Sequence, residues 1–122
     1  MGKKGSVAVE ACLVFPILIV LVFGITEYGL YFLRSYGTEQ ITFEAARTGG
    51  ITDGESDVKK NAAELKAAEL IVKYGLSDRG YTVTVNVSDD YTTVTLYSPY
   101  NSLTGLMPLP VSIGSTFEYL NY

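Results

Sequence analysis

The feature that most constrains this sequence is an apolar segment close to its N-terminus. Ala11 to Ile25 is a run of 15 residues without a charged side chain, and no lysine or arginine occurs between Ser6 and Leu33. Glu10 and Glu27 are the charged residues in that longer stretch. A helix rises about 1.5 Å per residue, so about 20 residues cross a hydrocarbon core of about 30 Å. The sequence therefore predicts one membrane-spanning helix from about residue 11 to 33.

The basic residues on either side of this helix predict its orientation. Lys3 and Lys4 precede the apolar segment, whereas the sequence just beyond it carries Arg34 alone. Cytoplasmic flanks of membrane helices carry the excess of lysine and arginine. We therefore expect the N-terminus in the cytoplasm and the remaining domain outside. A secretory signal peptide is the competing interpretation, but no convincing small-x-small cleavage site follows the apolar run.

The predicted helix contains two carboxylates and a proline, which an apolar helix accommodates only at a cost. A carboxylate at the edge of an apolar helix needs a cationic or hydrogen-bonding partner. Glu10 is therefore expected to pair with an amine, to stay hydrated among headgroups, or to fold back onto the preceding lysines. Pro16 removes one helical hydrogen bond, which predicts a kink or local melting over residues 12–16. Glu27 lies about 25 Å further along the helix, at the outer interface or shallow in the membrane, and its role stays open.

The remaining residues are expected to form a small α+β head. The first helix should stop at Gly49-Gly50, and a second should cover residues 57–74 with Gly75 as its C-cap. Its predicted apolar stripe, which would cover a sheet, consists of Val58, Ala62, Leu65, Ile71 and Val72. Alternating apolar residues predict three antiparallel strands over residues 81–87, 91–97 and 111–119.

The first two strands are expected to form a hairpin with a definite register. If Asp89 and Asp90 are the two-residue turn, Val85 lies opposite Val94. The same register places Val83 opposite Leu96, so the apolar residues of both strands share one face.

Composition narrows the chemistry that the chain can carry. There is no histidine, the one cysteine is Cys12 inside the apolar segment, and the net charge is −4 with scattered basic residues. A single cysteine forms neither an intrachain disulfide nor a multi-cysteine metal site, and no basic stripe is available for a phosphate backbone. The carboxylates at residues 53–57 and 89–90 lack the spacing of an EF-hand loop. We expect no enzyme, no cofactor, no metal, no nucleic acid and no small-molecule substrate.

The order of residues at the start of the chain carries a family resemblance. The segment from Lys3 to Phe32 reads KKGSVAVEACLVFPILIVLVFGITEYGLYF. It contains, in this order, two basic residues, a glycine, four further residues, a glutamate and a long apolar stretch predicted to be helical. This order resembles the class III leader and N-terminal helix of TadE-like proteins of the Tad (Flp-type) pilus system. The resemblance implies that a membrane prepilin peptidase cuts between Gly5 and Ser6, so that Glu10 becomes the fifth mature residue. It also implies that Glu10 pairs with the N-terminal amine of a neighbouring subunit.

The resemblance implies a TadE-like minor pilin, or pseudopilin, that takes part in assembly of an adhesive Tad/Flp-type pilus. Residues 1–5 would be the prepilin leader, 6–48 the long helix and 49–122 the extracytoplasmic head. Its partners would be the prepilin peptidase, other pilin or pseudopilin subunits, the pilus assembly platform and membrane lipid, at the prokaryotic inner membrane or in the pilus itself. The alternative is a single-pass envelope protein whose head binds a partner or surface ligand. The choice between minor and major subunit stays open.

Overall fold

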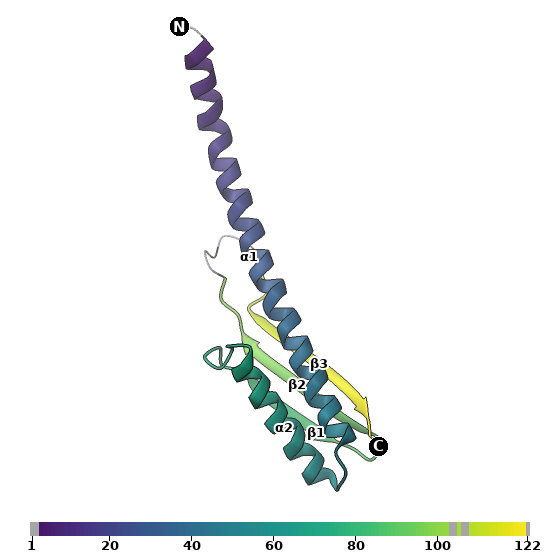
Figure 1. Cartoon of the computed structure of the whole chain (residues 1–122). Helices are drawn as coiled ribbons and strands as arrows, with labels where there is room; N and C mark the ends of the chain where they lie inside the picture. The colour runs from purple at the N-terminus through teal and green to yellow at the C-terminus, as the bar shows by residue number, and fades with distance from the viewer. Residues whose placement is uncertain (1–2, 103–104, 106–107, 122) are drawn as a thin grey trace.

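A single continuous helix forms the first part of the molecule. The computed structural model describes residues 3–102, 105 and 108–121, and α1 spans Lys3–Ile51. Figure 1 shows its N-terminal half projecting as a rod away from a head that the other elements form around its C-terminal half. The head contains α2 (Ser56–Lys73), β1 (Thr82–Val87), β2 (Tyr91–Pro99) and β3 (Ser112–Leu120). This arrangement confirms the predicted α+β fold, and the element boundaries agree with the sequence prediction to within three residues.

A lysine side chain caps the C-terminal end of α1. Both Gly49 and Gly50 lie inside the helix, which continues to Ile51. The Lys59 ammonium donates hydrogen bonds to the carbonyl oxygens of Gly50, at 3.0 Å, and Thr52, at 2.7 Å. A cation at this position satisfies carbonyls that have no partner within the helix and opposes the negative end of the helix dipole. The glycines were expected to stop α1, but the helix continues past them to this cap.

The three strands form one antiparallel sheet in the order β1-β2-β3. The hairpin register is the predicted one, with Val85 opposite Val94 and Val83 opposite Leu96. The backbone N–H of Ser88 donates to the carbonyl oxygen of Tyr91 at 2.8 Å, which closes the expected turn. The alternating apolar residues therefore predicted both the strands and their pairing correctly.

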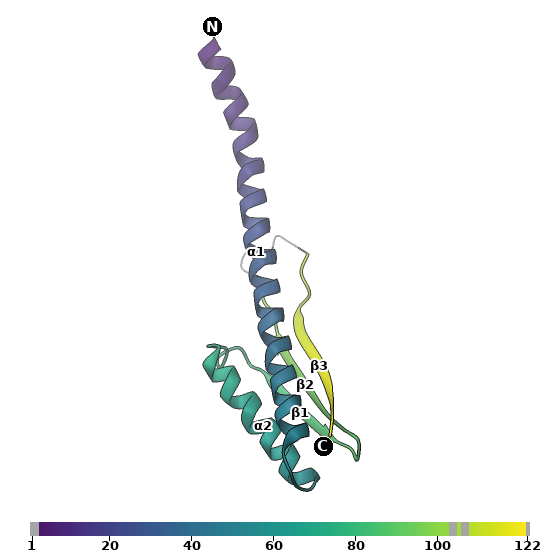
Figure 2. The same cartoon turned by 45° about the vertical axis from the view of Figure 1, so that its right-hand side comes forward.

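Both helices pack on the same side of this sheet. Figures 1 and 2 show α1 crossing β2 and β3, with α2 beside it next to β1. The buried apolar residues between the two layers are Ile41, Ala45, Ala46, Ala63, Ala67, Leu70, Ile71, Val85, Val94 and Leu96. Burying an Ile, Leu or Val side chain completely contributes about 1.5–3 kcal/mol, so this cluster holds the head against the C-terminal half of α1.

The predicted apolar stripe of α2 was largely wrong. Val58, Leu65 and Val72 are 48%, 72% and 67% exposed, and the buried face instead carries Lys59, Ala63, Ala67, Leu70 and Ile71. The close approach of the two helices explains the difference, because a Cβ added to Gly49 would lie 3.0 Å from the Cβ of Ala63. Only small side chains fit at that crossing, so the alanines turn inward and the larger Val58, Leu65 and Val72 face outward.

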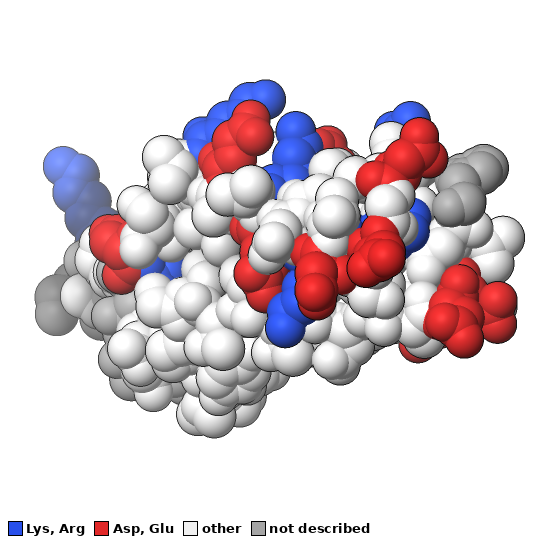
Figure 3. All heavy atoms as spheres, turned by 90° about the horizontal axis from the view of Figure 1, so that it is seen from below, with Lys and Arg blue, Asp and Glu red and all other residues white. Residues whose placement is uncertain are grey.

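Charges of both signs lie on the head. Figure 3, a view from below, shows acidic and basic side chains interspersed along the top, across the middle and at the right, while the lower left is uncharged. The sheet itself carries one charged residue, Glu118. A single-sign field of the kind that attracts nucleic acid is not visible on this face.

Candidate functional site

The N-terminal half of α1 is an exposed apolar rod. Every residue from Ser6 to Phe23 is exposed, and the large apolar side chains among them include Leu13, Phe15, Ile17 and Leu21. Among the described residues, α1 is the one helix that is long and apolar enough to cross a membrane. An apolar surface of this extent is unfavourable in water, so the rod indicates a lipid or protein environment.

The residues of the predicted cleavage site and the carboxylate near them lie at the start of α1. Gly5 is half-buried, whereas Ser6 and Glu10 are exposed. The ion pair found among the described residues joins Arg79 to Asp78 at 3.6 Å, so the structure shows no ion pair from Glu10 to the two preceding lysines. The exposed carboxylate of Glu10 is therefore open to a group from outside the chain.

Pro16 lies within the exposed rod. The structure assigns α-helix on both sides of Pro16 and through it, so the helix is not interrupted there. A kink at this residue stays a prediction.

Glu27 differs from its surroundings on the helix. Its side chain is 1% exposed, whereas that of Ile25 is 67% exposed. Gly24, one turn earlier, is also buried. A segment of the head lies beside this part of α1, since the Tyr28 hydroxyl donates a hydrogen bond to the carbonyl oxygen of Pro108 at 3.5 Å. Glu27 therefore lies on the side of α1 that the head covers, which the sequence had not indicated.

Arg34 holds the head onto α1, and sequence reasoning missed this role. Its Nε donates to the Tyr81 hydroxyl at 3.3 Å, and its Nη2 donates to the Ser98 hydroxyl and, at 3.3 Å, to the Pro99 carbonyl oxygen. The guanidinium also lies over two rings, 5.4 Å from the centroid of Tyr81 and 5.5 Å from that of Tyr100. Such a planar, multiply hydrogen-bonded cation is typical of a structural clamp.

Aromatic contacts extend this clamp toward the N-terminus. The rings of Tyr31 and Tyr100 meet edge to face with their centroids 5.2 Å apart. The Tyr81 hydroxyl lies 2.7 Å from Thr38 Oγ1, so the tyrosine joins Arg34 to the next turn of α1. The signal available in the sequence was a lone arginine directly after an apolar run, in a chain with many tyrosines. We call these residues, Tyr31, Arg34, Thr38, Tyr81, Ser98 and Tyr100, the helix–head junction.

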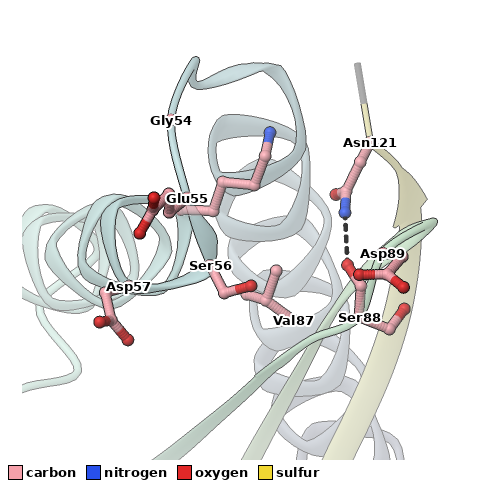
Figure 4. Close-up of a pocket in the computed structure, with 9 residues that line it drawn as sticks. Gly54, Glu55, Ser56, Asp57, Val87, Ser88, Asp89 and Asn121 are labelled. Carbon is pink, nitrogen blue, oxygen red and sulfur yellow. Dashed lines mark hydrogen bonds between the residues drawn. The ribbon is translucent and has the colours of Figure 1, made fainter.

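A hollow of about 420 Å³ lies at the opposite end of the head. Figure 4 shows Glu55 and Asp57, from the start of α2, on one side of it and Asp89, from the hairpin turn, on the other. Asn121 donates its side-chain N–H to the Ser88 carbonyl oxygen at 2.9 Å. Among the described residues, no three histidine, cysteine or carboxylate side chains are grouped so that they could hold a metal ion. Glu55 and Asp57 lie at the positive end of α2 and Asp89 in a turn, which are positions that favour acidic residues.

Comparison with known proteins identifies the N-terminal helix. Residues 5–47 match the family described as TadE-like protein. Searches of curated proteins and of solved structures each return no match. The matched residues contain the whole exposed rod and all three junction residues of α1, Tyr31, Arg34 and Thr38. A match to this family, together with an apolar N-terminal helix, fits a membrane protein related to the Tad pilus. TadE-like proteins are structural pilus components rather than known enzymes.

Proposed function

We propose that this chain is a minor pilin, or pseudopilin, that takes part in assembling a Tad/Flp-type adhesive pilus, because residues 5–47 match the TadE-like family. The observation that carries the proposal is that the family match and the exposed rod coincide on α1. A helix that leaves every residue from Ser6 to Phe23 exposed has the surface that a membrane or neighbouring subunits would cover. Packing of this rod against other pilin subunits and the assembly platform needs no catalytic group.

The proposed processing removes residues 1–5 as a prepilin leader. Cleavage between Gly5 and Ser6 by a membrane prepilin peptidase leaves a cationic amine on Ser6. Lys3 and Lys4 are exposed at this end of α1, which favours a cytoplasmic N-terminus and an extracytoplasmic head at the prokaryotic inner membrane.

Glu10 would guide assembly after this cleavage. An ionised carboxylate inside lipid or among packed apolar helices is costly unless a cation pairs with it. The Glu10 carboxylate is exposed on the rod, so the Ser6 amine of a neighbouring subunit can reach it. That pairing would fix how far the helix of one subunit is shifted along its axis relative to the helix of the neighbouring subunit.

The first test is the mature N-terminus. Native protein isolated from cells that contain the peptidase is expected to begin at Ser6 by intact-mass and N-terminal peptide analysis. The matched control is a strain with an inactive peptidase, in which the chain should begin at Met1 or Gly2. A chain that keeps residues 1–5 when the peptidase is active would contradict the proposal and favour a plain single-pass anchor whose head binds an envelope partner.

The second test separates assembly from processing. Glu10→Ala is expected to be cleaved after Gly5 as efficiently as the wild type, but to be incorporated into pili at a level at least about tenfold lower, since a pairing worth about 1.4 kcal/mol changes an equilibrium tenfold. Quantitative immunoblotting of the pilus and membrane fractions measures both steps. Glu39→Ala is the control, because Glu39 is an exposed carboxylate of the same helix outside the rod. Normal incorporation of Glu10→Ala would remove Glu10 from the mechanism.

A further inference from the structure

The uncharged surface of α1 continues well into the part of the helix that carries the head. Between Ala11 and Tyr36 the two charged side chains are Glu27, which is 1% exposed, and Arg34, which is bound in the helix–head junction. Phe32 and Leu33 are 64% and 69% exposed. These 26 residues span about 39 Å, which exceeds a hydrocarbon core of about 30 Å and approaches the full bilayer with its headgroups, about 40–45 Å.

Residues of the head lie beside the C-terminal end of this uncharged surface of α1. Pro108 accepts a hydrogen bond from Tyr28 at 3.5 Å, and Tyr100 packs edge to face on Tyr31. The backbone N–H of Tyr100 donates to the carbonyl oxygen of Val111 at 2.8 Å, which places Val111 at this level as well. The described ends of the connection between β2 and β3 therefore lie beside α1 within the predicted membrane span.

The chemistry of these residues suits a bilayer interface. Val111 is 81% exposed, and Pro108 and Pro110 are exposed as well. Proline has no backbone N–H, so it leaves no donor to be satisfied where water is scarce. From Tyr91 to Phe117 the sequence contains no charged residue. Exposed apolar and proline residues, flanked by tyrosines and free of charge, are compatible with the boundary between lipid chains and headgroups.

We propose that this end of the head lies in the outer interface of the bilayer, where Phe32, Leu33, Pro108, Pro110 and Val111 contact lipid. Lipid is the occupant because the surface is continuous with the rod that the membrane surrounds, so the bilayer meets it without any further partner. The proposal rests on the membrane anchoring of α1 in the proposed function. In this position the head shields one side of α1, including Glu27, from the lipid.

Two exposed charged residues of the head lie beside the outer end of this surface. Asp78 and Arg79 line a hollow of about 420 Å³ together with Leu30, Leu33 and Arg34. Their side chains are 76% and 56% exposed, so both reach solvent. An arginine next to exposed leucines at the edge of a bilayer extends its guanidinium to the headgroup phosphates. The headgroup layer would accordingly lie at the level of Arg79, with the sheet outside it.

Site-directed spin labelling of the full chain tests this placement. The protein is reconstituted in nanodiscs of phosphatidylcholine and phosphatidylglycerol at about three to one, in a Cys12→Ser background that removes the native thiol. Labels are placed singly through Val111→Cys and Leu33→Cys at the proposed interface. Val20→Cys in the rod and Thr84→Cys on the outer face of β1 are the lipid and water references. All four positions are exposed, so a label does not disturb the core.

The measured quantity is the ratio of collision rates with oxygen, which concentrates in lipid, and with a nickel chelate, which stays in water. The labels at Val111 and Leu33 are expected to give similar ratios, each at least about threefold above that at Thr84 and below that at Val20. A Val111 ratio equal to that of Thr84, with Val20 in lipid, would overturn the interfacial placement and leave the anchoring intact. A Val20 ratio equal to that of Thr84 would overturn the anchoring as well, and with it the proposed function.

Discussion

At the residue scale, a lysine rather than a glycine completes the end of the long helix. Lys59 is 7% exposed, and its ammonium reaches back from the first turn of α2 to the carbonyl oxygens of Gly50 and Thr52. Buried lysines are rare unless their charge is satisfied. Here the negative end of the α1 dipole and two carbonyl oxygens satisfy it, so one side chain caps one helix and joins it to the next.

Lys59→Met is expected to destabilise the head. The substitution keeps most of the apolar stem but leaves two carbonyl oxygens without their donor, at a cost of about 1–3 kcal/mol. For a domain of this size each kcal/mol lowers the melting temperature by about 4–8 °C. Thermal unfolding of the full chain in detergent micelles, followed by circular dichroism, measures the change. Lys60→Met is the control, because Lys60 is the exposed neighbour, and an equal effect of both variants would contradict the capping role.

At the element scale, α2 shows how packing distance selects a buried face. Its apolar residues are found all around the helix, so more than one face could have been turned inward. The approach of α2 to Gly49 admits Ala63 and excludes a larger side chain. The face that carries the alanines is therefore buried, although its side chains are smaller than Val58, Leu65 and Val72 on the exposed face. Leu70 belongs to the same buried face.

Two leucines on opposite faces of α2 test this orientation. Leu70→Ala is expected to cost about 2–5 kcal/mol, because Leu70 is 2% exposed and its removal leaves a cavity. Leu65→Ala is expected to change the stability by less than about 0.5 kcal/mol, because Leu65 is 72% exposed. Chemical denaturation of the reconstituted full chain compares the two. A larger loss from Leu65→Ala would mean that the predicted stripe, rather than the alanine face, is buried.

At the scale of the whole molecule, the helix–head junction determines where the head sits along α1. The core near Ile41 and Ala45 holds the far end of the head, while Arg34 and the tyrosines around it hold the end next to the rod. Loss of the second attachment would leave the core intact but release the membrane-proximal end. The junction thus links the position of the rod in the bilayer to the height of the head above it.

Arg34→Gln is expected to loosen this end selectively. Glutamine keeps hydrogen-bonding groups but cannot reach Tyr81, Ser98 and Pro99 together or stack over two rings. Amide hydrogen exchange is expected to rise in β2 near Ser98 and in α1 near Tyr31, and to stay unchanged in the Val94 region of the core. Arg47→Gln serves as the control, because Arg47 is an exposed arginine of the same helix. An increase spread evenly over the head would indicate general destabilisation instead of a local clamp.

The sequence indicates those parts of the candidate site whose signals are local, and the cleavage after Gly5 and the pairing of Glu10 remain predictions. The order of Lys3, Lys4, Gly5 and Glu10 before an apolar run lies within a few residues, and the family match, which begins at residue 5, includes Gly5 and Glu10 but not the two lysines. Glu27 and Arg34 look alike in the sequence, as single charges next to apolar residues. The contacts of Arg34 are made with Tyr81, Ser98 and Tyr100, and that of Tyr28, beside Glu27, with Pro108, all of them 47 or more positions away along the chain.

The amino-acid sequence by itself determined the long helix, the three strands and the hairpin register, because hydropathy and the alternation of apolar residues act between near neighbours. Only the tertiary structure decided which face of α2 is buried, which carbonyls Lys59 caps, and where the head meets α1. Those outcomes depend on distances between separate elements. Gly49 allows α2 to lie close to α1, and Arg34 joins α1 to the head. The closeness of these contacts determines which side chains water can reach.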